Sequence, residues 1–265
     1  MSHSEQQATP DAILQMTPTP LDSKQQSRNT YWSKQAKGYR QKWATPRPEA
    51  DLYKELEAAL LIEASRAKPG KKILDLCCGT GRNTVALAHT GAQMWGLDGA
   101  EGMLEQARQH AIGQDIDNVT FQQGDSRSLP FSDNTFDGVT GTRFMYMMSP
   151  DEKRQIIQEV HRVLKPGGRA AIHFNCGLWG IKQELLNLAK GRQFRLRSRY
   201  LWPGQTAGLF EGFQVDGLIG VKIPRLALLS RLTGRKAALV VNRLLRFFPF
   251  RHLSAYAIVI ATCRK

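Results

Sequence analysis

Residues 73–84 read ILDLCCGTGRNT, an apolar run that ends on an acid and is followed by two adjacent cysteines and a short glycine loop. The apolar run is typical of a buried strand, and a helical pattern begins after the loop. Glycines let the backbone pass close to a ligand, and the start of a helix offers unpaired N–H donors. The stretch therefore predicts a strand–loop–helix unit that holds a ligand at its loop.

The same rhythm of short apolar strands and helices continues on both sides of this stretch. The predicted strands cover residues 71–78, 92–99, 118–125, 136–142 and 169–175. The predicted helices between them cover residues 82–91, 101–113 and 151–168. Such alternation indicates a doubly wound α/β fold, a mostly parallel sheet with helices on both faces. Two late strands, 212–223 and 253–265, predict an antiparallel C-terminal edge strand.

Three acids stand at the ends of three successive predicted strands: Asp75, Asp98 and Asp125. In a doubly wound sheet, ligands bind beyond the carboxyl ends of the strands. Asp98 follows Asp75 by 23 positions, which suits a carboxylate that accepts hydrogen bonds from two ribose hydroxyls. The pattern therefore predicts a cofactor that contains a nucleoside.

The loop itself distinguishes between two such cofactors. A dinucleotide fingerprint has three glycines, whereas here Gly79 and Gly81 are followed by Thr84. Asp75 precedes the loop, where a carboxylate suits a cofactor that carries an ammonium and a sulfonium group. These residues favour S-adenosylmethionine over NAD.

Four motifs in order resemble those of class I S-adenosylmethionine-dependent methyltransferases, which have a Rossmann-like fold. They are ILDLCCGTG, GLDGAEGMLEQAR, GDSRSLPFSDNTFDGV and EVHRVLKPGGRAAI, and the resemblance covers about residues 30–178. The sequences of these motifs most resemble those of small-molecule members such as the quinone-biosynthesis methyltransferases. The resemblance implies a transferase with S-adenosyl-L-methionine as its cofactor.

The resemblance also implies which residues bind that cofactor. They are Asp75, Cys77, Gly79, Gly81, Asp98, Gly99, Met103, Asp125, Ser126, Arg143, Tyr31 and Tyr39. In this assignment Met103 packs on the adenine, and Asp125 and Ser126 lie at the purine edge. The alternatives are a helix cap for Asp75, a turn residue for Asp125 and a core residue for Met103.

Cys77 stands where the family usually has its first loop glycine. We expect this position to need a small side chain without a positive φ, so that cofactor binding survives. A metal or redox role for Cys77 and Cys78 is disfavoured, because no further Cys or His cluster has ligand spacing. With only four scattered cysteines, the chain is expected in a reducing cytoplasm and without a metal.

Methyl transfer requires few catalytic side chains, because the sulfonium is already a good leaving group. Positioning of the acceptor supplies much of the acceleration. A general base is needed only for a protonated acceptor. The candidates for catalysis are His173, at the end of the fifth predicted strand, and Tyr146, after the fourth. The alternative for His173 is a strand residue satisfied by its neighbours.

The N-terminal part is predicted to contain two segments. Residues 1–28 are rich in Gln, Ser, Thr and Pro and predict a disordered leader, with no export signal. Residues 29–70 predict a helical cap, and residues 29–43 within it contain four aromatic residues, Tyr31, Trp32, Tyr39 and Trp43. These aromatic residues form either a lid over the cofactor or a helix face packed on the core at 71–178.

The last segment, 179–265, is expected to be a basic, apolar substrate or lid region with the closing strands. Residues 182–251 contain 14 basic and three acidic side chains, out of a chain total of 37 and 23. An amphipathic stretch, AALVVNRLLRFF, favours peripheral contact with an anionic membrane, and hence a small, hydrophobic, lipid-like acceptor methylated at O, C or N. The same stripe can instead pack on the domain.

Two other functions stay open. RQFRLRSRYLW can bind nucleic acid, although TGTRFMY lacks the motif of amino-base methylation. The other is a cofactor-binding regulator without transferase activity. The sequence leaves the oligomeric state undetermined.

Overall fold

The computed structural model describes residues 22–46, 48–176, 208–220 and 256–265, together with residues 185, 189, 200 and 201. The predicted amphipathic stretch at 237–248 and the arginine-rich segment at 192–202, apart from the backbone of residues 200 and 201, lie outside the described residues.

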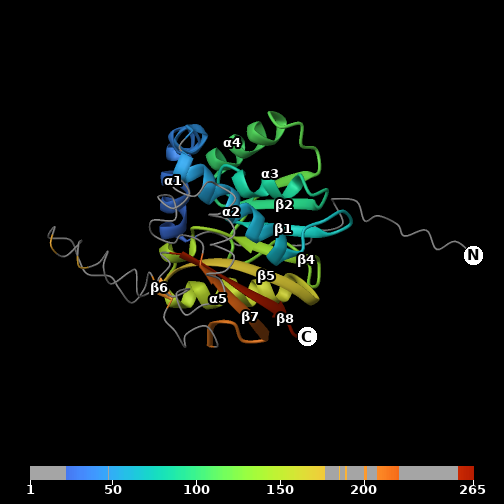
Figure 1. Ribbon diagram of the computed structural model, residues 1–265. Helices are drawn as coiled ribbons and strands as arrows, with labels where there is room; N and C mark the ends of the chain where they lie inside the picture. The colour runs from blue at the N-terminus through green and yellow to red at the C-terminus, as the bar shows by residue number, and fades with distance from the viewer. Residues whose placement is uncertain are drawn as a thin grey trace, which may run out of the picture.

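A single mixed sheet forms the centre of the molecule (Figure 1). Its strands follow the order β3-β2-β1-β4-β5-β8-β7, and β6 pairs with β5 off this path. The strand bounds are β1 (Lys72–Leu76), β2 (Gln93–Asp98), β3 (Val119–Gln123), β4 (Phe136–Gly141), β5 (Leu164–Cys176), β6 (Tyr200–Leu201), β7 (Phe213–Gly220) and β8 (Tyr256–Cys263). The order reverses between β1 and β4, so the sheet has the topological switch point at which doubly wound folds bind ligands.

The C-terminal strand supplies the antiparallel pairing. β1 to β5 pair in parallel, whereas β8 runs antiparallel to both β5 and β7. β8 therefore lies one position inside the edge that β7 forms. The predicted α/β fold with antiparallel pairing at the C-terminal edge is confirmed.

Helices cover both faces of the sheet. Their bounds are α1 (Ser23–Ala44), α2 (Pro48–Ser65), α3 (Arg82–Ala88), α4 (Glu101–Ile112) and α5 (Pro150–Val163), with a 3-10 turn η2 (Met145–Met147). One core joins α2 and α3 to the sheet through residues such as Leu60, Leu87 and Ile73. The core that includes α5 lies on alternate strand positions and contains Leu74, Phe136 and Ile157. Figure 1 shows α3 and α4 near β2 at the top of the view and α5 near β5 and β7 lower down.

Helix α1 begins earlier than the sequence suggested. Residues 23–28 belong to this helix, and the Asp22 side chain caps it by accepting a hydrogen bond from the Gln25 N–H at 2.7 Å. The predicted leader boundary at residue 28 is therefore wrong at its C-terminal end. The first turns of α1 carry polar side chains because they make polar contacts, so their composition resembled that of a disordered segment.

Helix α1 lies against α4 through small residues. A Cβ added at Gly99 would come within 2.6 Å of the Asn29 amide, and one at Gly102 within 2.7 Å of the Ser33 carbonyl oxygen. The Gly102 N–H donates to Ser33 Oγ at 3.2 Å. This close approach brings α1 to the carboxyl end of β2.

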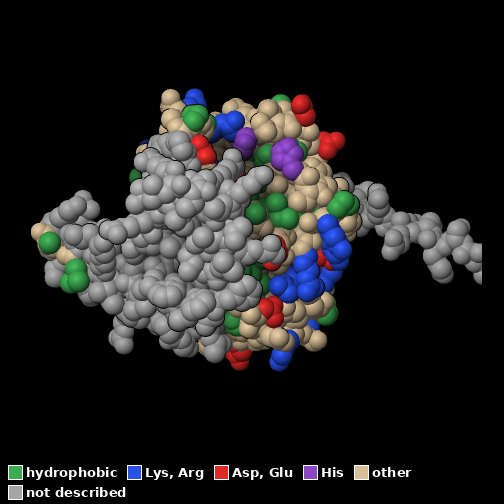
Figure 2. Space-filling view, viewed as in Figure 1, with side chains coloured by type: hydrophobic (Ala, Val, Ile, Leu, Met, Phe, Trp, Pro, Cys, Tyr) green, Lys and Arg blue, Asp and Glu red, His purple; other side chains and the backbone are tan. Residues whose placement is uncertain are grey.

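Basic side chains gather on part of the described surface in Figure 2, with acidic side chains among them. Some basic side chains form ion pairs at the other end of the strands: Lys71 and Lys165 each lie 3.0 Å from Asp137. In the described part of the chain, no helix is both long enough and apolar enough to cross a membrane.

Candidate functional site

The loop between β1 and α3 is held in an unusual backbone conformation. Cys77, Gly79 and Gly81 have φ values of 49°, 56° and 74°, all in the left-handed region. A Cβ at Gly81 would come within 2.9 Å of Ala107, so that glycine also permits α4 to approach. The expectation that position 77 needs no positive φ is wrong: the tight turn after β1 imposes a left-handed residue there, and cysteine adopts it at a cost.

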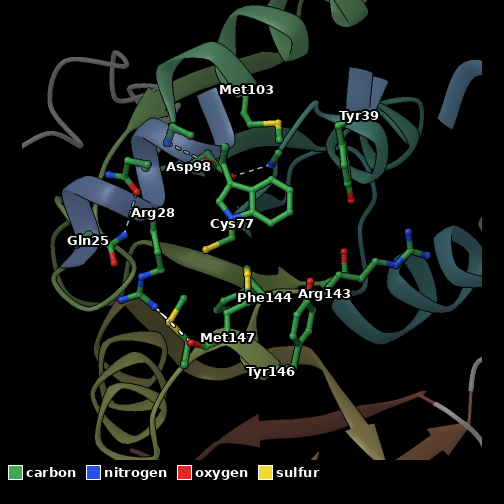
Figure 3. A pocket seen from close by; sticks show the side chains of 17 residues that line it. Gln25, Arg28, Tyr39, Cys77, Asp98, Met103, Arg143, Phe144, Tyr146 and Met147 are labelled. Carbon is green, nitrogen blue, oxygen red and sulfur yellow. Dashed lines mark hydrogen bonds between the residues drawn. The ribbon is translucent and has the colours of Figure 1, made fainter. Parts of the chain in front are cut away.

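Asp98 connects this loop to the next helix. Its Oδ2 accepts the Gly79 N–H and its Oδ1 accepts the Ala100 N–H, both at 2.9 Å. Burial raises the pKa of the carboxyl, and the backbone donors work against that shift. The carboxylate lies on the wall of an open cavity (Figure 3).

Asp75 does not line that cavity. Its carboxylate is 2% exposed and accepts hydrogen bonds from Thr84 Oγ1 at 2.7 Å and Thr140 Oγ1 at 3.0 Å. Asp75 thereby ties β1 to α3 and β4 behind the loop. Its predicted contact with the cofactor stays a prediction, and in this geometry its contacts are structural.

Asp125 is likewise held by the protein itself. Arg127 Nη2 donates to its Oδ2 at 2.7 Å, and Arg127 Nε lies 3.0 and 3.1 Å from the two carboxylate oxygens. The residue is not part of the cavity wall. Its neighbour Ser126 is 5% exposed and hydrogen bonds to the Cys77 side chain.

Helix α1 closes one side of the cavity with aromatic residues. Trp32 and Tyr39 line it, and Met103 faces it from α4 and packs with Ala36. Tyr31 is 56% exposed and lies off the cavity wall, although its ring makes an edge contact with Trp32 at 5.3 Å. Trp32 and Tyr39 therefore line the cavity and also pack on one another, and a lid over the cofactor stays a prediction.

The opposite wall follows β4. It consists of Thr142, Arg143, Phe144, Tyr146, Met147 and Met148. Tyr146 and Phe144 are drawn on this wall in Figure 3, facing the α1 residues across the cavity. Thioether and aromatic groups dominate this side, which therefore suits an apolar ligand.

Arg143 lines the cavity but directs its guanidinium outward. Its Nη2 lies 3.0 and 3.1 Å from the two carboxylate oxygens of Glu57, and its guanidinium carbon is 4.4 Å from the centre of the Trp43 ring. Arg82 also pairs with Glu57. Burial works to raise the pKa of Glu57, but Arg143 and Arg82 outweigh it and hold that pKa below its usual range.

His173 lies behind this wall. It is 2% exposed, and its Nδ1 accepts the backbone N–H of Arg143 at 3.2 Å. Burial lowers the pKa of His173 to about 4, so the ring is neutral and carries its proton on Nε2. A nitrogen that already accepts a hydrogen bond is poorly placed to take a proton, and the predicted catalytic role stays a prediction.

Some of the cavity residues and their supports were not identified from the sequence. They are Gln25, Arg28, Asn29, Ala100, Thr142 and Phe144 on the wall and Glu57 behind it. Glu57 could have been noticed in the sequence, because it is an acidic residue beside the apolar stripe of α2. Gln25 and Arg28 follow a helical spacing with Asn29, but they fell within the predicted leader.

The two loop cysteines are half-buried, and Cys77 lines the cavity. Burial raises the pKa of both the Cys77 and the Cys78 thiol well above the usual range, which leaves them protonated. No group of three or more potential metal ligands occurs among the described residues.

The strained backbone at residue 77 predicts a stability difference between two variants. Cys77→Gly should be about 1 kcal/mol more stable in urea unfolding than Cys77→Ala, because alanine keeps a Cβ in the left-handed region. Both variants lose the thiol, so the comparison isolates the backbone. An alanine variant as stable as the glycine variant would contradict the strain.

The environment of Asp75 predicts that the stability of the fold depends on pH. Burial raises its pKa from 3.8 to about 6, so the folded protein binds more protons than the unfolded chain between these values, and stability falls as pH rises through that window. Asp75→Asn cannot ionise, so from about pH 4 to pH 7 it should gain about 2 kcal/mol relative to the wild type. Urea titrations at both pH values measure this gain. Asp115→Asn, at an exposed loop residue, should show none.

Comparison with known proteins places this site in a family. Residues 73–168 match the model of a methyltransferase domain. A demethylmenaquinone methyltransferase from Bacillus mycoides is 41% identical over 176 residues, covering 59% of this chain and 73% of the relative. An uncharacterised methyltransferase from Synechocystis is 41% identical over 113 residues, covering 43% of this chain and 51% of that protein.

A solved structure agrees in fold. The putative methyltransferase of Haloferax volcanii, in complex with the Trm112 methyltransferase activator, superposes with a TM-score of 0.61 at 20% identity, covering 88% of this chain and 98% of the other. The chain spans about half or less of the length of the first curated relatives it matches. The motifs, the strand order and the relatives agree: the chain belongs to the class I S-adenosylmethionine-dependent methyltransferases, near the quinone-biosynthesis members.

Proposed function

We propose that this protein transfers the methyl group of S-adenosylmethionine to a small, apolar, ring-containing acceptor. The observation that carries the proposal is the contrast between the two sides of one cavity. Asp98 and Gly79 form a polar side, and the wall after β4 presents Phe144, Tyr146 and the thioethers of Met147 and Met148. A cofactor on the polar side would face an acceptor held by apolar contacts.

The residues present suit the cofactor. The Asp98 carboxylate would accept the two ribose hydroxyls, since two backbone N–H groups already orient it on the cavity wall. Met103 and Trp32 would pack on the adenine, and Tyr39 would close the cavity above it. When bound, the cofactor supplies an electrophilic methyl group on a sulfonium leaving group.

The protein contributes positioning and exclusion of water. Helix α1 covers the cavity on one side and the wall after β4 encloses the other, so an acceptor would be held for in-line displacement. For a protonated acceptor, Tyr146 is the candidate general base on the wall after β4, and it would have to act as a phenolate. His173 would act only indirectly, by holding the backbone of Arg143.

Relatives suggest the kind of acceptor. Several proteins that are 40–44% identical to this chain over 103–176 residues are demethylmenaquinone methyltransferases. We therefore take demethylmenaquinone as the first acceptor to test, with the methylated atom undetermined. Peripheral contact with an anionic membrane would suit such a substrate, but it depends on residues 237–248, outside the described chain.

Methyl-label transfer tests the proposal. The full chain, incubated with methyl-labelled S-adenosylmethionine and reduced demethylmenaquinone in detergent, should place the label in the organic phase. Label confined to RNA, in a parallel reaction with total RNA, would contradict the apolar acceptor. Cofactor binding without transfer to any acceptor would support a regulator instead.

Asp98→Ala should weaken the binding of S-adenosylhomocysteine by at least about tenfold in isothermal titration, because charged hydrogen bonds to both ribose hydroxyls are lost. Glu105→Gln, at an exposed acid on α4, is the matched control and should bind normally. Unchanged affinity in the alanine variant would remove Asp98 from the site.

A further inference from the structure

The N-terminal turns of α1 bring three polar residues to the cavity. Gln25, Arg28 and Asn29 follow one another at helical spacing and all line its wall. Figure 3 shows Gln25 and Arg28 extending from α1, with dashed hydrogen bonds at both residues. The described aromatic residues of α1 lie further along the helix, so this end forms a separate, polar part of the cover.

Each of these residues has a buried polar atom without a hydrogen-bond partner among the described residues. The atoms are Gln25 Oε1, Arg28 Nε and Asn29 Nδ2. Gln25 is only 8% exposed. A buried polar atom without a partner costs about 1–3 kcal/mol, so three at one end of a ligand cavity indicate partners that a ligand supplies.

Other polar atoms of these residues already form hydrogen bonds within the protein. Gln25 Nε2 donates to Asn29 Oδ1 at 3.1 Å. Arg28 Nη2 donates to Glu152 at 2.5 Å and its Nη1 to the Met147 carbonyl oxygen at 3.4 Å. The bond between the two amides leaves one acceptor, on Gln25, and one donor, on Asn29.

One acceptor beside one donor matches an edge of adenine. The base presents its 6-amino group as a donor next to a ring nitrogen that accepts, and Gln or Asn side chains recognise this pair. Asn29 lies against Gly99, directly after Asp98, as the added-Cβ distance of 2.6 Å shows. The amide pair therefore lies beside the carboxylate that would hold the ribose.

The acid that the family resemblance assigns to this edge is engaged elsewhere. The Asp125 carboxylate pairs with Arg127, whose Nη1 also lies 2.8 Å from Asp22, the capping residue of α1. Asp125 thus helps to fix the start of α1 and does not line the cavity.

We propose that Gln25 and Asn29 recognise the adenine edge of the cofactor, with Gln25 Oε1 accepting from the 6-amino group. This inference rests on S-adenosylmethionine being the cofactor. Helix α1 is then part of the binding site for the base as well as its cover.

The test compares two ligands by isothermal titration with the full chain. One is S-adenosylhomocysteine, and the other is its analogue in which hydrogen replaces the 6-amino group. The wild type should bind the analogue about three- to tenfold more weakly, the size expected for one neutral hydrogen bond. In Gln25→Ala the two ligands should bind equally.

Three further variants separate recognition from folding. Gln25→Glu keeps an acceptor oxygen and should keep the preference for the 6-amino group. Gln26→Ala, at the exposed neighbouring position, and Asp125→Asn should keep it as well. Circular dichroism checks that α1 remains helical in each variant.

The outcomes are distinguishable. A preference that persists in Gln25→Ala, or that disappears in Asp125→Asn with α1 intact, overturns the inference while the cofactor assignment stands. A wild type that binds neither ligand overturns the cofactor assignment and this inference with it.

Discussion

The structure of the site depends on one buried carboxylate that accepts two backbone hydrogen bonds. Asp98 takes the N–H of Gly79 from the loop after β1 and the N–H of Ala100 from the start of α4, each at 2.9 Å. These bonds set the distance between two loops at the carboxyl end of the sheet, where doubly wound folds bind ligands. They also orient the carboxylate towards the cavity. The glycine loop and the cover formed by α1 are built around this position.

Much of the fold could be predicted because its signals are local. Apolar runs followed by glycines marked β1 and β2, and a capping box at Ser149 and Glu152 begins α5. Acids at successive strand ends pointed to the cofactor edge. The alternation of strands and helices then left few topologies.

The partners of individual side chains could not be predicted, because they come from distant segments. Asp75 and Asp98 look alike in the sequence, yet the hydroxyls of Thr84 and Thr140 enclose Asp75 while Asp98 faces the cavity. Asp125 pairs with Arg127, which also binds Asp22 from the distant start of α1. The start of α1 carries the polar composition of a disordered leader, because its contacts are hydrogen bonds and ion pairs.

Amide hydrogen exchange of the full chain, with and without S-adenosylhomocysteine, tests most directly whether loop, carboxylate and α1 form one cofactor site. The account predicts slower exchange with ligand in three separate segments: residues 77–82, 98–103 and 23–40. The first two contain the N–H groups that hold Asp98, and the third is the helix that covers the cavity. Protection confined to other segments, or its absence from α1, would contradict the account.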